Sequence, residues 1–468
     1  MTRSRAAHYF ELLKGSYWFI PSVMALGSIL LAAGLGLLDA HFGEAWLGAQ
    51  GSILETTPGG ARAVLGTIAG SMITVAGVIF SMTMVSVSFA AGQFGPRLIG
   101  NFMRDRGNQI TLGVFIATFV YCLVVLRMVR SAESGDADEL FGSFVPHSAV
   151  AFAMLAALAC IAVLIYFIHH NLETINVGNL TAAVGKRLVA AVEDMFPERL
   201  GEGGNDRGLS AELLEARFEG GTSICSTGGG YVLAIDGDGL MQLARTHDTT
   251  FLLERRPGDF VTCGSPVIGL LPGFDPDDAL VASLRNCYRL GKERTVEQNL
   301  LFLVDQLVEI LGRALSPGVN DPFTARSCIN WMRCGLEEMA TRCTPNAGRR
   351  DDDGAVRIVA RPLSFEDFAA AMFDQTKQYV AADRNAAVSM MLMIRDALAR
   401  VGDDERRRIL LGHARKLAAA AEVSLEIEAD QEEVASMLRA LEHAPQSEAS
   451  SSPSLLAGAA MGSSLPSA

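Results

Sequence analysis

Hydroxyl side chains recur at regular intervals along one face of a long apolar segment. Of the side chains in this sequence that could bind a ligand, they have the most regular spacing. They are Thr67, Ser71, Thr74, Ser81 and Ser88, spaced by three, four or seven residues. At 3.6 residues per turn this spacing places them on one side of a helix. Inside a membrane such hydroxyls either bond neighbouring helices or hydrate a path for ions. The spacing leaves both interpretations open.

Polar and basic residues follow this hydroxyl face closely along the chain. Gln93, Arg97, Arg104 and Arg106 would form a rim at the cytoplasmic end of such a path. Rings of Arg or Lys favour anions at the mouth of a channel. We therefore treat these four residues as a candidate cytoplasmic rim.

A second candidate is the segment Ser316-Pro-Gly-Val-Asn-Asp-Pro322. Glycine and proline would end a helix predicted over 295–315, Asp321 would cap the next helix, and Pro322 would open it. This structural interpretation explains the segment as a turn between two helices. The functional alternative is a loop that presents Ser316, Asn320 and Asp321 to a ligand or a partner subunit.

Patterns for catalysis and for metal binding are weak. His169, His170 and Glu173 have metal-ligating side chains, but no second cluster accompanies them. The three glycines 228–230 are not followed by the Gly-Lys-Ser/Thr of a phosphate-binding loop. The eight cysteines form no CxxC pair. We expect no catalytic residues, no metal and no cofactor.

Membrane-spanning helices must position the hydroxyl face. A hydrocarbon core of about 30 Å is crossed by about 20 apolar residues in a helix. Four runs meet this requirement, at 17–38, 63–91, 110–126 and 149–168. None of them contains Asp, Glu or Lys, whereas ion-coupled pumps usually carry carboxylates at mid-membrane. The pattern favours a passive pore or an anchor over a coupled transporter.

The distribution of Lys and Arg predicts the orientation of these helices. Because basic segments stay in the cytoplasm, both chain termini are expected there, with two short acidic loops outside. Arg3, Arg5, Lys14, Arg97, Arg104, Arg106, Lys186 and Arg187 lie on one side, and Arg62, Arg127 and Arg130 lie on the other.

The predicted fold is an α-helical membrane domain of four helices, with both ends cytoplasmic, joined to an α+β cytoplasmic region. Asp305, Glu309 and Arg313 are expected on the outer side of the helix 295–315, where Glu309 and Arg313 would form an ion pair. Five regions are predicted along the chain. Residues 1–170 form the membrane domain, and residues 171–208 contain a linker and most of an amphipathic connecting helix over 169–196. Residues 209–273 form a small β-rich, barrel-like module with a tight turn at Pro257-Gly258, residues 274–443 form a helical bundle, and residues 444–468 form a disordered tail.

Three stretches together resemble one family of bacterial proteins. They are Ser81-Met-Thr-Met-Val-Ser-Val-Ser-Phe-Ala-Ala-Gly-Gln-Phe-Gly-Pro-Arg97, Arg256-Pro-Gly-Asp-Phe-Val261 and Arg313-Ala-Leu-Ser-Pro-Gly-Val-Asn-Asp-Pro-Phe-Thr-Ala325. They are similar to the predicted membrane proteins grouped as domain of unknown function 2254. The resemblance covers about residues 15–441. It implies a multi-pass protein of the inner membrane and carries over no reaction, ligand or functional residue.

Two classes of function follow from these observations. The first is a homo-oligomeric channel or passive pore controlled by the cytoplasmic region. The alternative is a membrane-anchored sensor or scaffold whose cytoplasmic region binds a ligand or a protein. The expected partners are the lipid bilayer, further copies of the chain and an ion or small molecule whose identity the sequence leaves open. Nucleic acid is excluded, because the net charge is −13 and there is no basic footprint.

Overall fold

The computed structural model describes residues 17–47, 57–98, 105–130, 144–196 and 211–443. The chain divides into two compact units, residues 1–180 and 181–468, which are described separately below. We call them the membrane unit and the second unit. The predicted tail at 444–468 and Arg104 of the predicted rim lie outside the described residues.

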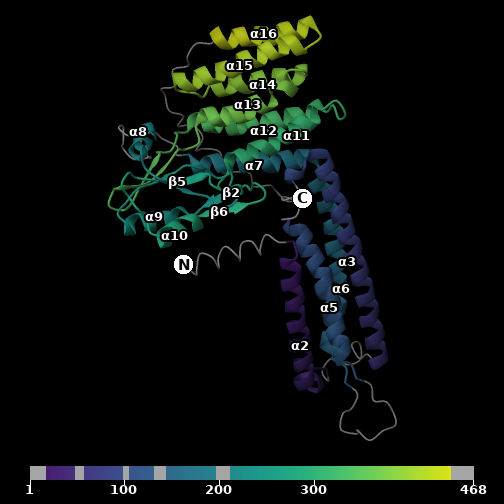
Figure 1. Cartoon of the computed structure of the whole chain (residues 1–468). Coiled ribbons are helices and arrows are strands. Elements are labelled where there is room, and N and C mark those ends of the chain that lie inside the picture. The colour runs from purple at the N-terminus through teal and green to yellow at the C-terminus, as the bar shows by residue number, and fades with distance from the viewer. Residues whose placement is uncertain (1–16, 48–56, 99–104, 131–143, 197–210, 444–468) are drawn as a thin grey trace, which may run out of the picture. The chain divides into compact units, whose positions relative to one another are not determined.

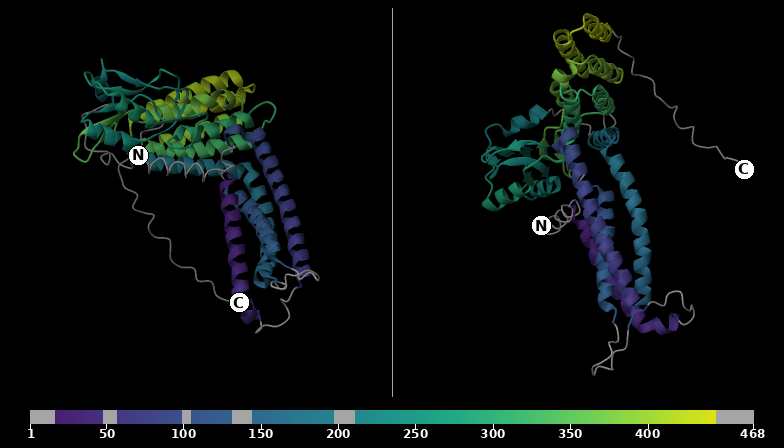
Figure 2. Two further views of the ribbon diagram at one scale, coloured as in Figure 1. Left: turned by 60° about the horizontal axis from the view of Figure 1, so that its bottom comes forward. Right: turned by 90° about the vertical axis from the view of Figure 1, so that its right-hand side faces the viewer.

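Four long apolar helices form the membrane unit, as the sequence predicts. Each is long and apolar enough to cross a membrane, over Phe19–His41, Pro58–Phe94, Arg106–Met128 and His147–Thr174. Figures 1 and 2 show these helices running alongside one another. The helices themselves are α2 (Phe19–Leu47), α3 (Pro58–Phe94), α5 (Arg106–Met128) and α6 (His147–Ile175), with a short 3-10 turn η1 (Pro96–Leu98) after α3.

Helix α5 lies at the centre of the unit and packs against α2, α3 and α6. Gly113 of α5 faces Pro21 and Met24, and Met128 faces Gly36, so α2 and α5 run in the same direction. Helix α3 runs the opposite way. Its residues pack in two clusters, first with Tyr121 and Val125 and then with Leu112 and Phe115. The start of α2 and the end of α6 therefore lie at the same end of the bundle.

Carboxylates close two of the helix ends. Asp105 caps α5 by accepting a hydrogen bond from the Gly107 amide at 2.8 Å. Helix α6 begins after Pro146, which supplies no side-chain cap. Asp39 of α2 takes that role and accepts from the amides of Ser148 and Ala149 at 3.1 and 3.2 Å. The first candidate span includes Asp39 and the fourth includes Glu173, so the prediction that no span contains Asp or Glu is wrong.

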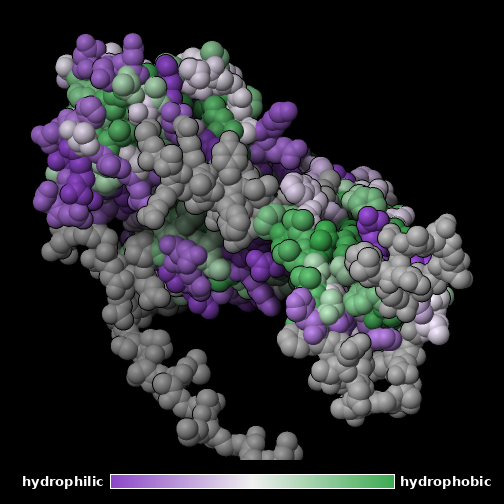
Figure 3. Space-filling model, turned by 90° about the horizontal axis from the view of Figure 1, so that it is seen from below, coloured by the Kyte–Doolittle hydropathy of each residue, from purple (hydrophilic) through white to green (hydrophobic). Residues whose placement is uncertain are grey.

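Large apolar side chains cover the outer surface of the membrane unit. Leu30 of α2 is 74% exposed, and Leu158 and Ile165 of α6 are 65% and 66% exposed. Figure 3 shows hydrophobic residues gathered on the face of this unit that is seen from below, whereas hydrophilic residues predominate on the second unit. Exposed apolar side chains of this size match a lipid environment.

Helix α6 does not continue into the connecting segment, so the predicted single helix over 169–196 is wrong. Asn176 adopts an extended conformation, and its side chain accepts from the Gly178 amide at 2.8 Å. A new helix, α7 (Val177–Met195), starts there. Asparagine favours this kind of local turn because its side chain competes for backbone amides.

The β-rich part of the second unit forms two open sheets, and a closed barrel is absent from the described residues. Three of its strands come from beyond the predicted boundary at 273, so the sequence placed that boundary too early. The sheet orders are β1-β5-β3-β8-β7 and β4-β2-β6. The elements are α8 (Ala211–Glu215), η2 (Ala216–Phe218), β1 (Ser223–Cys225), β2 (Gly230–Ile235), α9 (Gly237–Thr246), β3 (Phe251–Leu253), β4 (Phe260–Val261), β5 (Pro266–Leu270), α10 (Asp278–Asn286), β6 (Tyr288–Gly291), β7 (Gly348–Arg350) and β8 (Val356–Ala360).

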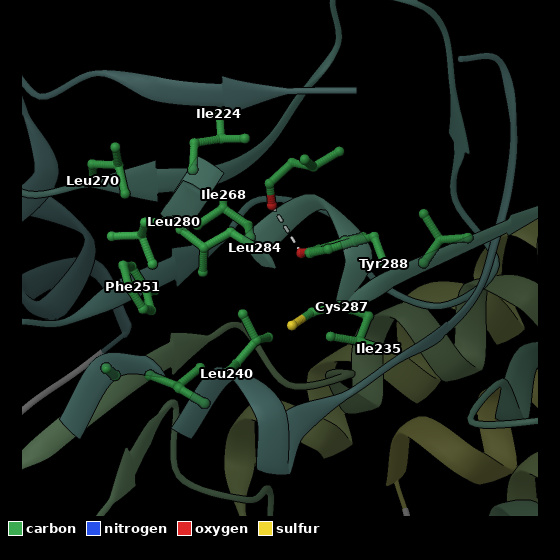
Figure 4. Packing of buried hydrophobic residues seen from close by; sticks show 14 of the residues in the cluster. Ile224, Ile235, Leu240, Phe251, Ile268, Leu270, Leu280, Leu284, Cys287 and Tyr288 are labelled. Atoms are coloured by element: carbon green, nitrogen blue, oxygen red, sulfur yellow. Dashed lines mark hydrogen bonds between the residues drawn. The ribbon is translucent and has the colours of Figure 1, made fainter. Parts of the chain in front are cut away.

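One apolar core holds all of these strands except β7 together with α9 and α10. Phe251, Ile268, Leu240 and Leu284 are fully buried in it. The hydroxyl of Tyr288 enters this core and donates to the Val267 carbonyl at 2.8 Å (Figure 4). The bond satisfies the one polar group of an otherwise apolar ring.

Helices make up the rest of the second unit and lie in successive layers (Figure 1). The predicted helix over 295–315 is confirmed but starts later, because Asn299 caps it by accepting from the Phe302 amide at 3.2 Å. The predicted ion pair is also present, with Arg313 and Glu309 3.8 Å apart. The helices are α11 (Leu300–Ala314), α12 (Pro322–Thr341), α13 (Phe365–Val380), α14 (Arg384–Leu398), α15 (Asp404–Ser424) and α16 (Glu428–His443).

Candidate functional site

The hydroxyl face of α3 points away from its own bundle. Five residues define this stripe, which we call the α3 stripe, and all five are exposed: Thr67, Ser71, Thr74, Ser81 and Ser88. The opposite face of α3 packs inside the unit through Leu65, Ala69, Ala76, Ile79 and Thr83. Among the residues that the structure describes, the other helices of the membrane unit therefore leave the α3 stripe uncovered.

Three hydroxyls of the α3 stripe are bonded to the backbone of their own helix. Thr67 donates to the Ala63 carbonyl, Ser71 to the Thr67 carbonyl and Thr74 to the Gly70 carbonyl, each at 2.8 Å. This pattern satisfies the hydroxyl protons without a second helix. The oxygen lone pairs still face outward and accept hydrogen bonds.

Glycines lower the surface beside the α3 stripe. Gly66, Gly70 and Gly77 are exposed, and a Cβ atom built on any of them would meet no atom within 4 Å. Small residues three or four positions apart allow two membrane helices to approach closely. The exposed face of α3 therefore combines open space and outward-facing hydroxyl oxygens with large apolar side chains such as Val78 and Val85, which are 62% and 65% exposed.

The predicted rim lies beside the α3 stripe at the end of the bundle where α3 ends and α5 begins. Gln93, Arg97 and Arg106 are exposed there. Between them in the chain, Asp105 pairs with His170 of α6, whose Nε2 lies 2.7 Å from the carboxylate. His170 comes this close because it packs over Gly107, where a Cβ atom would lie only 2.6 Å from its ring nitrogen. The rim therefore contains an acidic side chain, Asp105, as well as basic ones.

The loop between α11 and α12 is a structural turn. Ser316 donates to the Arg313 carbonyl at 2.6 Å, and Asn320 takes a left-handed conformation with φ of 47°. Asp321 accepts from the amides of Phe323 and Thr324 at 3.1 Å and from the Thr324 hydroxyl at 2.6 Å. The predicted capping role of Asp321 is confirmed, and all three candidate ligand residues already serve the turn.

These bonds stabilise the charged form of Asp321. The hydrogen bond from the Thr324 side chain is the largest cause, and it lowers the pKa of Asp321 below its ordinary value. Partial burial raises the pKa, but the backbone amides of Thr324 and Phe323 oppose that effect. The carboxylate therefore remains ionised at neutral pH and holds the start of α12.

A buried polar junction joins α11 to its neighbours, and sequence reasoning missed it. Asp305 was predicted on the outer side of its helix, but it is only 5% exposed. It pairs with Arg294 and accepts from the Gln375 side chain at 3.1 Å. The correction arises because α13 packs on the side of α11 that the pattern assigned to solvent. The sequence pattern around Asp305 contains nothing that identifies Arg294 and Gln375 as its partners.

Two residues just before α11 connect it to the sheets. Gln298 pairs with Ile235 of β2 like a neighbouring strand, accepting from its amide at 3.0 Å and donating to its carbonyl at 3.2 Å. Asn299 lies against Gly258, in the predicted Pro257-Gly258 turn, where φ is 98°. Gly258 of the Arg256–Val261 motif therefore lies directly against the residue that caps α11.

Among the described residues there is no group of three metal-ligating side chains from His, Cys, Asp and Glu. His169 contacts Glu173 at 3.3 Å on the exposed surface of α6. His170 instead turns to Asp105. His169 and His170 therefore contact different carboxylates and do not point to one shared site.

Comparison with known proteins identifies relatives but no activity. The chain is 29% identical over 414 residues to an uncharacterised protein of Mycobacterium tuberculosis, across 87% of this chain and 76% of the relative. An uncharacterised protein of Mycobacterium bovis matches with the same identity and coverage. No solved structure matches. The family model of the predicted membrane proteins DUF2254 matches residues 14–396. With its four apolar helices, the chain is therefore a multi-pass membrane protein and belongs to the DUF2254 family.

Proposed function

We propose that several copies of this chain assemble in the membrane around a passive pore, with the α3 stripe facing the path between copies. The observation that carries the proposal is the direction of the stripe. Its hydroxyls and glycines lie on the face of α3 opposite to the face that packs within one copy. The second unit would control access to this path.

Lipid is a poor neighbour for this face. Hydroxyl oxygens that face acyl chains lose their hydrogen bonds with water, and glycines leave the helix surface incompletely packed. The outer faces of α2 and α6 present large side chains such as Leu30 and Leu158, whereas on α3 exposed large side chains such as Val78 and Val85 alternate with hydroxyls and glycines. This mixed surface of α3 supports contact with another copy or with water.

The orientation is part of the proposal. We infer that the end of the bundle that carries Arg97 and Arg106 faces the cytoplasm of the inner membrane, because basic residues are retained on that side. The start of α2 and the end of α6 share this end, so both chain termini would be cytoplasmic. A reporter fused after Leu441 should then be cytoplasmic, and a reporter inserted at Asp136 should be external. Detection of the Asp136 reporter on the cytoplasmic side would contradict this orientation.

Single cysteines test whether water reaches the α3 stripe. Each of Ser71, Thr74 and Ser81 is replaced by cysteine in a background without the native cysteines, and a small water-soluble thiol reagent is applied to the protein in bilayers. We expect modification at these positions and a change in conductance. Leu158→Cys is the matched control, since Leu158 is 65% exposed on an apolar face and should not react. Unreactive cysteines at all three positions would refute the pore.

The alternative function is a membrane-anchored scaffold or sensor. It is favoured by an apolar tip of the second unit, where Val319 is 49% and Phe323 is 72% exposed. Arg326 lies over the Phe323 ring at 5.4 Å and leaves its other face open. Light scattering on the purified protein separates the two functions. A strict monomer would leave no path between copies, and the scaffold would then be the better account.

A further inference from the structure

Polar side chains form a layer inside the membrane unit, close to the end where α5 begins. We call it the polar layer. Apart from Tyr17, which is half-buried, none of its members is more than 7% exposed. It consists of Tyr17, Thr83, Ser86, Asn108, Gln109, Thr111 and Asn171.

Helix packing places these residues at one level. Pro21 of α2 packs on Gly113, so Tyr17, one turn earlier, lies near Gln109. Ile79 of antiparallel α3 packs in the same cluster as Leu112, so Thr83 lies one turn further on, near Asn108. Asn171 of α6 closes the layer by donating to the Ser86 hydroxyl at 3.1 Å.

Buried oxygens on two neighbouring residues of α5 lack a hydrogen-bond partner among the described residues. They are Oδ1 of Asn108 and Oγ1 of Thr111, whose side chains are 2% and 1% exposed. The two residues are three positions apart and lie on neighbouring turns of α5. A buried polar oxygen without a partner is unfavourable, so it normally indicates a bound water or ion.

The surroundings define how a ligand would enter. Towards the middle of the membrane an apolar cluster that includes Ile79, Phe115 and Phe167 blocks the layer. On the other side lies the pair of Asp105 and His170, which are partly exposed. A ligand would therefore arrive past Asp105.

We propose that the polar layer binds a monovalent metal cation, Na⁺ or K⁺, through Asn108 Oδ1 and Thr111 Oγ1. Both free atoms are hydrogen-bond acceptors, which suit a cation. The layer contains only neutral oxygens, whereas Ca²⁺ and Mg²⁺ sites are built on carboxylates. Asp105 adds one negative charge nearby and offsets the positive partial charge at the start of α5. The site lies inside a single copy and does not depend on the proposed pore.

Ion-dependent stability of the purified full-length protein tests this site. Choline chloride is replaced stepwise by NaCl or KCl at constant ionic strength, and the melting temperature is recorded. We expect a saturable rise with Na⁺ or K⁺, because a ligand that binds only the folded state stabilises it. Identical melting temperatures in choline, Na⁺ and K⁺ would overturn the proposal, and water alone would then occupy the layer.

Variants assign the ion to the polar layer. The double variant Asn108→Leu with Thr111→Val should lose the ion-dependent rise and melt in choline no lower than the wild type, since it removes the two unpartnered oxygens. Thr118→Val is the matched control on the same helix. Its hydroxyl already donates to the Val114 carbonyl at 2.8 Å, so the rise should persist. A rise of unchanged size in the double variant would place the ion elsewhere and refute the proposal.

Hydrogen exchange on the wild type decides the question even if the double variant does not fold. Na⁺ or K⁺ should slow exchange of the amides at residues 106–112 relative to choline. Slowing confined to the second unit would contradict the proposed site.

Discussion

Replacing Asp305 by alanine should destabilise the second unit more than any other single change discussed here. Asp305 is 5% exposed and holds both Arg294 and Gln375. Its removal leaves the Arg294 guanidinium, which is 24% exposed, without its counter-charge. Breaking a buried pair on one side costs about 3–5 kcal/mol, and the partial exposure of Arg294 favours the lower end, about 3 kcal/mol. At roughly 2–4 °C per kcal/mol this corresponds to a fall of about 6–12 °C in melting temperature.

Trp331 provides the signal for this measurement. Its ring packs against Gly185 within the second unit, where a Cβ atom would lie 2.4 Å from the ring. The chain has three tryptophans, so substitution of Trp18 and Trp46 by phenylalanine leaves one fluorescent reporter. The melt is followed by its emission in the full-length protein.

Two further variants make the result interpretable. Asp305→Leu combined with Arg294→Met removes both charges and should recover most of the lost stability, because apolar replacement of a whole buried pair is often neutral. Glu433→Ala breaks the exposed pair with Arg384 and should cost less than about 1 kcal/mol. If Asp305→Ala melts within about 2 °C of the wild type, or the double variant melts lower than the single one, the reasoning on buried charge is wrong.

Three other predictions concern helix ends and close packing. Asp321→Ala should cost about 1–2 kcal/mol by uncapping α12, while Asp321→Asn should cost less. Because the pKa of Asp321 is lowered in the folded state, the stability it adds is present above its ordinary pKa of about 3.9 and is lost as pH falls through the folded value. Urea unfolding of the wild type and Asp321→Asn should therefore show a constant difference between pH 7 and pH 5 that shrinks as the pH falls below about 3.9. Asp39→Ala should cost about 1 kcal/mol in the membrane unit by uncapping α6, and unchanged resistance to detergent unfolding would contradict that role. Gly185→Ala should lower the melting temperature because its Cβ would overlap the Trp331 ring, whereas Gly412→Ala, with nothing within 4 Å in α15, should raise it slightly.

The sequence predicted the membrane helices because their signal is local. Each run is apolar over the length that a bilayer requires, and four such helices are present. The cap at Asp321 was predictable for the same reason, since Asp, Pro and the start of α12 are adjacent in sequence. The direction in which the α3 stripe points was not predictable, because periodicity shows which residues share a helix face but not which neighbours that face contacts.

Features that depend on distant partners escaped prediction. Strand β8 pairs with β3 across about a hundred residues of chain, so a boundary drawn at 273 separated strands of one sheet. Asp39 caps a helix that begins far along the chain, and Asp305 is buried by α13. The polar layer is likewise assembled from separate helices. Each of its residues, taken alone, is a single polar residue in an apolar segment, so the sequence does not indicate that they lie together.

Cross-linking along α3 tests most directly whether its stripe lies between copies. Gly70→Cys and Leu158→Cys are each made in a cysteine-free background, and the protein is oxidised in the membrane with a copper catalyst. Gly70 is on the exposed face of α3 with open space around it, and Leu158 is on the apolar outer face of α6. Our account predicts rapid disulfide-linked dimers through Gly70→Cys and few through Leu158→Cys. No dimers through Gly70→Cys, or equal dimer formation at both positions, would contradict the assembly around α3.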